Sequence, residues 1–119
     1  MEVVVILEIR ITKNDNLNVI SLNGKLDVFG SQQAKEAILD KMTTQENIII
    51  DMSHCNFVSN YGLYLLSVIA DKAKLLNINA IFVSITDKIS EIFYLTGFTD
   101  TITLEPTVED AIKKYSLVS

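Results

Sequence analysis

The sequence predicts a single α/β domain with a mainly parallel β-sheet, because segments typical of strands alternate along the chain with segments typical of helices. Two strand segments, 47–52 and 80–85, are largely apolar, as in strands that are buried on both faces. Hydrophobic residues make up 49% of the 119 residues, with one proline and four glycines, which excludes a disordered protein. No repeat or linker divides the chain, so we expect residues 1–119 to form one domain.

The first part of the chain is expected to form an antiparallel hairpin at one edge of the sheet. Residues 3–11 and 17–23 are β-rich, and the turn signal Lys13-Asn14-Asp15-Asn16 separates them. The segment from Gly24 to Gly30 is predicted to be a loop. It leads to a helix over residues 32–42 with Ser31 as its N-cap, in which apolar residues recur at helical spacing: Ala34, Ala37, Ile38 and Met42.

Three more helices are expected among the later strands. The second helix follows the strand at 47–52, runs from Tyr61 to Leu76, and has Asn77 at its C-terminal end. The third helix begins at Thr86 or Asp87 and stops at Gly97, and three of its residues should face inward: Ile89, Ile92 and Phe93. A short strand at 101–104 precedes Pro106 and a last helix with one apolar side: Val108, Ala111, Ile112 and Tyr115.

Composition and charge narrow the classes of function. The apolar run from Val3 to Leu7 is too short to span a bilayer and follows Glu2, so neither membrane insertion nor a secretory signal is expected. A single cysteine forms no intramolecular disulfide and suits the cytoplasm, the compartment that we expect. The net charge of −5, without a basic cluster, argues against nucleic acid as a partner, because such binding depends on neutralising phosphates.

The most informative segment, Ile48 to Leu63, reads Ile-Ile-Ile-Asp-Met-Ser-His-Cys-Asn-Phe-Val-Ser-Asn-Tyr-Gly-Leu. It resembles the signature of the STAS domain family: a strand ending in Asp-Leu-Ser, a loop with an aromatic residue, and Asp-Ser-Ser/Thr-Gly-Leu opening a helix. Three other segments resemble family motifs in the same order along the chain: Gly24-Lys25-Leu26-Asp27, Leu95-Thr96-Gly97-Phe98 and Glu109-Asp110-Ala111-Ile112. The resemblance is to the anti-sigma factor antagonist type, and it implies a STAS fold of about five strands and four helices.

The resemblance also implies a partner and a switch. In the family, this loop and helix dock an anti-sigma kinase, and phosphorylation of a serine or threonine in the loop breaks the contact. Here Ser59 replaces the acidic residue of the motif, and Asn60 and Tyr61 occupy the two hydroxyl positions. Ser59 is therefore the candidate phosphorylation site, but a helix N-cap is the favoured interpretation of this residue. We expect the usual phospho-switch to be absent.

Further residues complete the predicted partner-binding surface. The resemblance places Asp27 at the partner face, although an ordinary turn aspartate would fit as well. Gly62 should face the sheet and permit a close approach, within a core stripe of Gly62, Leu63, Leu66, Ile69, Ala70 and Ala73. Nearly opposite lie Tyr61, Tyr64, Val68 and Leu75. An apolar, tyrosine-rich outer face indicates contact with a partner, or a homodimer through helix 61–76, and the alternative is that a neighbouring helix covers it.

No pattern of catalytic or metal-binding residues is present. His54 and Cys55 are adjacent, and adjacent residues of an extended chain point to opposite faces, so they should not form a nucleophile pair. Cys55 is better explained as a small core residue, and Asp51 as a carboxylate bonded to the following loop. We expect no metal site, no cofactor and no enzymatic activity, since there is no dinucleotide fingerprint, P-loop or nucleophile elbow.

The residues thus favour a regulator that binds another protein. The first hypothesis is an antagonist that sequesters a kinase-like anti-sigma factor and so frees a sigma factor for transcription. The second is a STAS subunit of a larger assembly, such as a stressosome or a lipid-transport ABC complex. A third is binding of a small ligand or nucleotide at the helix ends, which no glycine-rich cradle supports.

Overall fold

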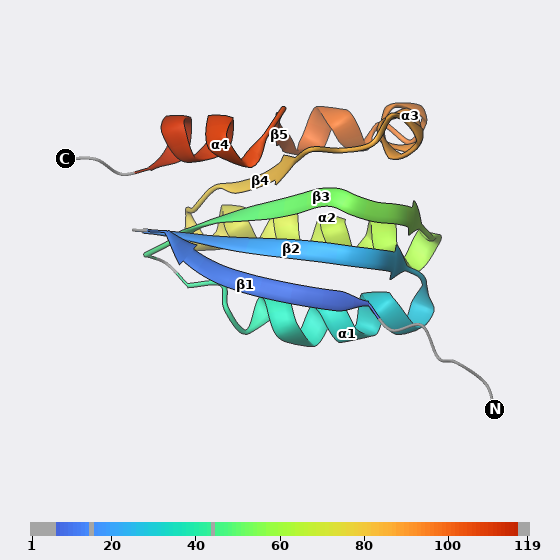
Figure 1. The fold of residues 1–119 in the computed structure, drawn as a ribbon, viewed down its shortest axis with the longest axis horizontal. Helices are drawn as coiled ribbons and strands as arrows, with labels where there is room; N and C mark the ends of the chain where they lie inside the picture. Colours follow the sequence, from blue (N-terminus) through green and yellow to red (C-terminus); the bar gives the residue numbers. More distant parts are fainter. Residues whose placement is uncertain (1–6, 15, 44, 117–119) are drawn as a thin grey trace.

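The computed structural model describes residues 7–14, 16–43 and 45–116, which form a five-stranded sheet with helices on both faces (Figure 1). The strand order follows the chain, and its members are β1 (Glu8–Asn14), β2 (Leu17–Leu26), β3 (Asn47–Val58), β4 (Ala80–Val83) and β5 (Thr103–Glu105). The helices are α1 (Val28–Leu39), α2 (Asn60–Leu76), α3 (Asp87–Leu95) and α4 (Val108–Tyr115), with a short 3₁₀ turn at Phe98–Thr101. β1 pairs with β2 antiparallel, and every other pair is parallel, which confirms the predicted α/β class.

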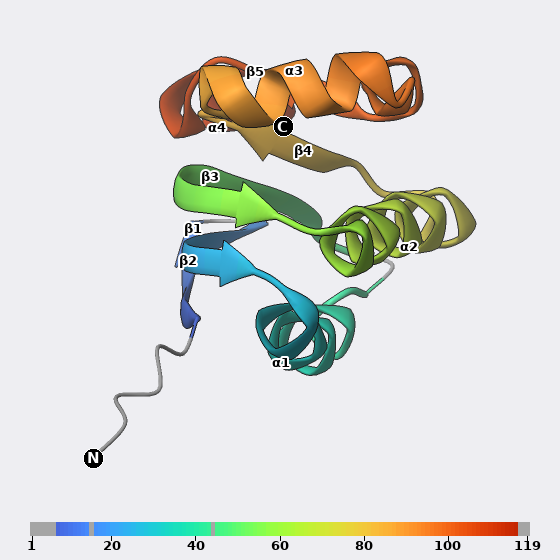
Figure 2. The same ribbon diagram turned by 90° about the vertical axis from the view of Figure 1, so that its right-hand side faces the viewer.

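Two hydrophobic clusters hold the layers together. α1 and α2 lie side by side on one face of the sheet, as the rotated view shows (Figure 2), and they close the larger cluster. α4 closes a smaller cluster on the other face through Ala111. β3 contributes to both, because Ile48 and Ile50 belong to the larger cluster and Ile49 to the smaller one. The run of three isoleucines is therefore buried on both faces, as the sequence predicts.

The start of α1 differs from the prediction. β2 continues to Leu26 and α1 begins at Val28, so the predicted loop from Gly24 to Gly30 is wrong. Ser31 is not the N-cap, because Asp27 caps the helix, and α1 ends at Leu39 instead of reaching residue 42. The cause is local: the Asp27 carboxylate accepts a hydrogen bond from the backbone N–H of Gly30, which starts the helix four residues early.

The ends of the strands differ from the predicted ends by a few residues. β3 runs on to Val58, beyond the predicted end at Met52, with irregular pairing against β2 near Asn23. β4 ends at Val83, because Ser84 has a left-handed backbone (φ 56°). β5 begins two residues later than expected. The predicted first strand lies partly outside the described residues, and β1 extends to Asn14, into the predicted turn. α2, α3 and α4 match their predicted segments closely.

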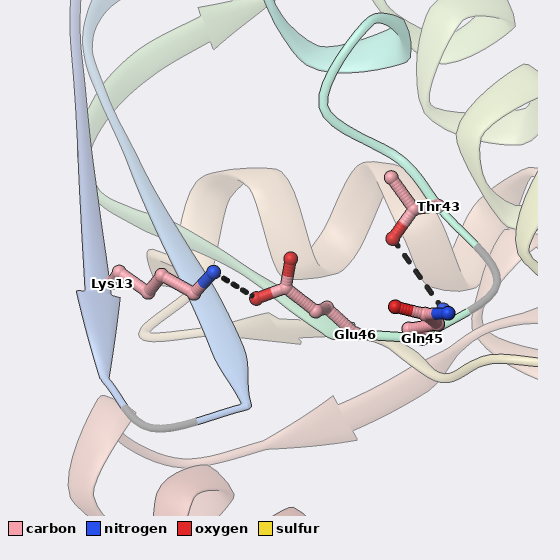
Figure 3. A network of polar contacts seen from close by, with 4 residues as sticks. All are labelled: Lys13, Thr43, Gln45 and Glu46. Carbon is pink, nitrogen blue, oxygen red and sulfur yellow. Dashed lines mark hydrogen bonds and ion pairs between the residues drawn. The ribbon is translucent and has the colours of Figure 1, made fainter.

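Polar contacts tie the amino ends of the strands together. Lys13 Nζ lies 2.9 Å from Glu46 Oε2, which joins the hairpin to the segment before β3 (Figure 3). In the same segment, the N–H of Gln45 donates to Thr43 Oγ1 over 3.4 Å. The buried side chain of Asn47 donates to the carbonyl of Tyr115 at the end of α4. These contacts hold the end of the sheet opposite to the one where α1 and α2 begin.

Candidate functional site

The candidate site lies at the carboxyl ends of β2 and β3, where two helices begin side by side. Leu26 and Val58 are the last paired residues of these parallel strands, and each chain then turns directly into a helix. Asp27 caps α1 by accepting a hydrogen bond from Gly30 N at 2.8 Å, and Ser59 caps α2 by accepting one from Gly62 N at 3.2 Å. Both caps therefore have the same spacing, with a glycine three residues after the capping side chain.

The Ser59 hydroxyl uses both its donor and its acceptor capacity. It donates to the carbonyl of Leu26 at 2.9 Å while it accepts from Gly62 N, and the Ser59 backbone N–H donates to the same carbonyl at 3.0 Å. This geometry agrees with the N-cap interpretation of Ser59. A phosphate on this oxygen would remove the O–H donor and place negative charge against the Leu26 carbonyl.

Both glycines are required by the close approach of helix and strand. A Cβ on Gly62 would lie 2.7 Å from Leu26 O and 2.9 Å from Val58 Cγ1, so Gly62 faces the sheet, as predicted. A Cβ on Gly30 would lie 2.1 Å from the carbonyl oxygen of Lys25. Sequence reasoning missed Gly30, although the shared cap-x-x-Gly spacing is a signal that could have found it.

The outer face of α2 is partly exposed and partly turned toward α1. Tyr61 is 63% exposed and Tyr64 69% exposed, as the predicted outer face requires. Val68 is half-buried, because it lines a groove between α2 and α1. The expected core stripe packs against the larger cluster, with Leu63 half-buried at its margin, and it omits Leu65, which is buried as well. Contact with a neighbouring helix therefore covers one flank of the predicted surface and leaves both tyrosines accessible.

Other apolar side chains extend this surface around the start of α1. Val28 and Phe29, in the first turn of α1, are exposed, and so is Phe57 near the end of β3. Asn60 is exposed at the first position of α2, whereas Asp27 is half-buried. The structure places six of the seven predicted partner-binding residues at the start of α1 and along the first half of α2, and we call these six the contact surface: Asp27, Ser59, Asn60, Tyr61, Tyr64 and Val68. The seventh, Gly62, is buried beneath them against Leu26 and Val58. That these residues bind a partner stays a prediction.

The histidine and the cysteine do not form a catalytic pair. Cys55 is buried in the larger cluster, its thiol donates to the carbonyl of Phe57, and burial raises the pKa of the thiol. His54 is exposed, and its Nδ1 lies 3.0 Å from the hydroxyl oxygen of Ser53. Asp51 accepts from the N–H of Ser53, but this bond lies within β3 and not in a following loop as expected.

Among residues 7–14, 16–43 and 45–116, no group of three His, Cys, Asp or Glu side chains is placed to hold a metal ion. No helix in that part of the chain is both long and apolar enough to cross a bilayer.

Comparison with known proteins agrees with the resemblance seen in the sequence. The family model for the STAS domain matches residues 8–111. The fold is similar to that of a candidate anti-sigma factor antagonist from Thermotoga maritima, with 14% identity over 90% of this chain and 93% of that one, and a TM-score of 0.83. It is similar to the Bacillus anti-sigma factor antagonist SpoIIAA in its unphosphorylated form, with 18% identity, 94% and 99% coverage, and a TM-score of 0.69. A chain of the stressosome, a signal integration and transduction hub, matches with 19% identity, 89% and 95% coverage, and a TM-score of 0.73.

Proposed function

Because this chain belongs to the STAS domain family, we propose that it is a regulatory protein that acts by binding another protein and not by catalysis. The observation that carries the proposal is the contact surface, where Tyr61 and Tyr64 stand exposed above two capped helix N-termini. Aromatic residues are enriched at protein interfaces, because they bury a large area at a small entropic cost.

We propose a kinase-like anti-sigma factor as the partner, so that binding frees a sigma factor in the cytoplasm and thereby controls the transcription that depends on this sigma factor. The proposal is supported by the motif at 24–27 and the one at 59–62, which resemble family motifs in sequence. The first motif ends β2 and caps α1, and the second follows β3 and begins α2, so both lie at the carboxyl ends of these two strands. The likeness to SpoIIAA, an anti-sigma factor antagonist, is a further support.

We propose that the amount of this protein, and not its phosphorylation, determines how much of the partner is bound. Asn60 and Tyr61 stand at the two positions where the family motif has hydroxyl groups. The remaining hydroxyl, on Ser59, is engaged in two hydrogen bonds that cap α2 and join it to β2. Transfer of phosphate to Ser59 would remove the O–H that donates to the Leu26 carbonyl and would place negative charge beside that carbonyl, which opposes the reaction.

Affinity capture from native lysate tests the proposal. The wild-type protein should recover a kinase-like anti-sigma protein, and Tyr64→Glu should lose it, because the charge is placed on the apolar surface. Tyr94→Glu is the matched control, since it makes the same change at an exposed tyrosine that lies on α3. Equal recovery by Tyr64→Glu, with an unchanged unfolding midpoint, would refute the proposed surface. Incubation with ATP and the recovered kinase should leave Ser59 unlabelled.

The second candidate is a subunit of a larger assembly, such as a stressosome or a lipid-transport ABC complex. The likeness to a chain of the stressosome favours it. In such an assembly, the contact surface would serve a permanent neighbour, and loss of the phosphorylation motif would have no regulatory effect. Recovery of an ABC ATPase or of further STAS proteins in the same capture would favour this candidate over the antagonist.

A further inference from the structure

The groove between α1 and α2 has a regular lining that includes Tyr61, Tyr64 and Val68 of the contact surface. It encloses about 420 Å³ beside the first turns of the two helices. Four residues of each helix line it: Val28, Ser31, Gln32 and Lys35 from α1, and Tyr61, Tyr64, Leu65 and Val68 from α2. Both sets have the spacing i, i+3, i+4 and i+7, so each wall runs along two helical turns, or about 10 Å.

The charge of the groove is opposite to that of the whole chain. Lys35 is the one charged residue that lines it, and no carboxylate of the described residues does so. The chain as a whole carries a net charge of −5. A ligand that fits this groove therefore combines apolar groups for the walls with a negative group for the Lys35 ammonium.

A buried hydroxyl in the groove is left without a partner. Ser31 lines the groove and is only 5% exposed, and its Oγ accepts and donates no hydrogen bond among the described residues. Buried polar atoms are nearly always satisfied in folded proteins, because an unpaired one loses its bonds to water without replacement. A polar atom of a bound partner would satisfy this hydroxyl.

We propose that this groove binds an amphipathic α-helix of the partner protein, with apolar residues at i, i+4 and i+7 and a carboxylate that pairs with Lys35. The inference rests on the proposed function and specifies which element of the partner binds. A helix suits the groove because both walls are helices whose backbone groups are already paired, so an extended peptide would find no open strand edge there. A third helix packs between two others by the ordinary fit of ridges into grooves.

The same charge argues against a second copy of this chain as the occupant. A symmetric dimer through this groove would bring two Lys35 side chains to one interface, and no carboxylate lines the groove to offset them. The charge therefore selects an acidic helix from a different protein.

A displayed library of helical peptides tests the proposal without knowledge of the natural partner. Peptides selected on the wild-type protein should carry an apolar stripe at i, i+4 and i+7 and an enriched aspartate or glutamate beside it. Their affinity should fall at least tenfold on Lys35→Glu, because an attraction becomes a repulsion. Lys113→Glu makes the same change at an exposed lysine of α4, on the opposite face of the sheet, and should leave the affinity unchanged. Selection on Lys35→Glu should enrich lysine or arginine at the same peptide position.

Several outcomes would overturn the proposal. These are a selection that yields no helical binders, binders that keep their affinity for Lys35→Glu, and sedimentation equilibrium showing a wild-type dimer that Lys35→Glu changes. The proposed function fails separately, if Tyr64→Glu still captures the native partner. If the partner is lost with Tyr64→Glu but no acidic helix is selected, the contact surface remains and only the helical occupant is refuted.

Discussion

Gly30→Ala tests the close approach of α1 to the end of β2, from which the geometry of the site follows. The new Cβ would lie 2.1 Å from the carbonyl oxygen of Lys25, whereas ordinary contact begins at 3.4 Å, so the two segments must separate by about 1.3 Å. The atom in the way is a backbone carbonyl oxygen, so no change of side-chain rotamer can relieve the contact. Overpacking of this kind costs about 1–3 kcal/mol or more, and the better helix propensity of alanine returns up to about 1 kcal/mol. We expect a net loss of about 2 kcal/mol in the free energy of unfolding.

Two other glycines provide matched comparisons. At Gly62 the Cβ would lie 2.7 Å from Leu26 O, which requires a shift of about 0.7 Å, so Gly62→Ala should cost about 1 kcal/mol. At Gly97 no atom lies within 4 Å, but the backbone is left-handed (φ 75°), so Gly97→Ala should cost about 1–2 kcal/mol from strain alone. The three variants thus separate steric contact from backbone strain.

Urea unfolding followed by far-UV circular dichroism measures these losses from the shift in midpoint, provided that the m-value is unchanged. Gly30→Ala should also disturb the amide signals of both helix N-termini, because the Lys25 carbonyl that it displaces is next in the chain to the Leu26 carbonyl that binds Ser59. A Gly30→Ala variant within about 0.5 kcal/mol of the wild type would refute the reasoning, since overpacking against backbone cannot be that small.

Three further predictions concern single side chains. Ser59→Ala should lower the free energy of unfolding by about 1–2 kcal/mol, because α2 loses its N-cap and a strand carbonyl loses a donor; Thr107→Ala, which removes only the exposed cap of α4, should cost less in the same urea titration. Burial raises the pKa of the Cys55 thiol, so its contribution to stability is complete below about pH 9 and is lost as the pH rises through the folded-state pKa. The stability difference between wild type and Cys55→Ala should therefore shrink above pH 9, and a constant difference would contradict the burial argument. Lys13→Ala should cost about 1–2 kcal/mol, because it leaves a largely buried carboxylate unpaired, whereas Arg10→Ala, in an exposed ion pair, should cost under about 0.5 kcal/mol; equal losses would show that the first pair is no more buried than the second.

Periodicity and motif order were enough to predict most of the fold. The runs at 47–52 and 80–85 are apolar because both faces of the central strands are covered, and that pattern depends only on the local sequence. The start of α1 was predicted wrongly for a physical reason. The predicted loop from Gly24 to Gly30 includes a glycine that lies in the first turn of the helix, because only glycine fits beside the Lys25 carbonyl. That carbonyl belongs to a strand, and its position cannot be derived from helix propensity.

Part of the candidate site can likewise be predicted from the sequence, and part depends on how the elements pack. The family motifs, the loss of the hydroxyl pair at Asn60 and Tyr61, and the tyrosine-rich face of α2 can be predicted from the chain alone, because they depend on residue identity and on spacing along one element. That Asp27 and Ser59 cap neighbouring helices, and that α1 and α2 form a groove lined by one cation, follows from the packed fold. Those features arise where parallel strands place separate segments side by side. Their distances are set by packing between elements, which the pattern within one element does not encode.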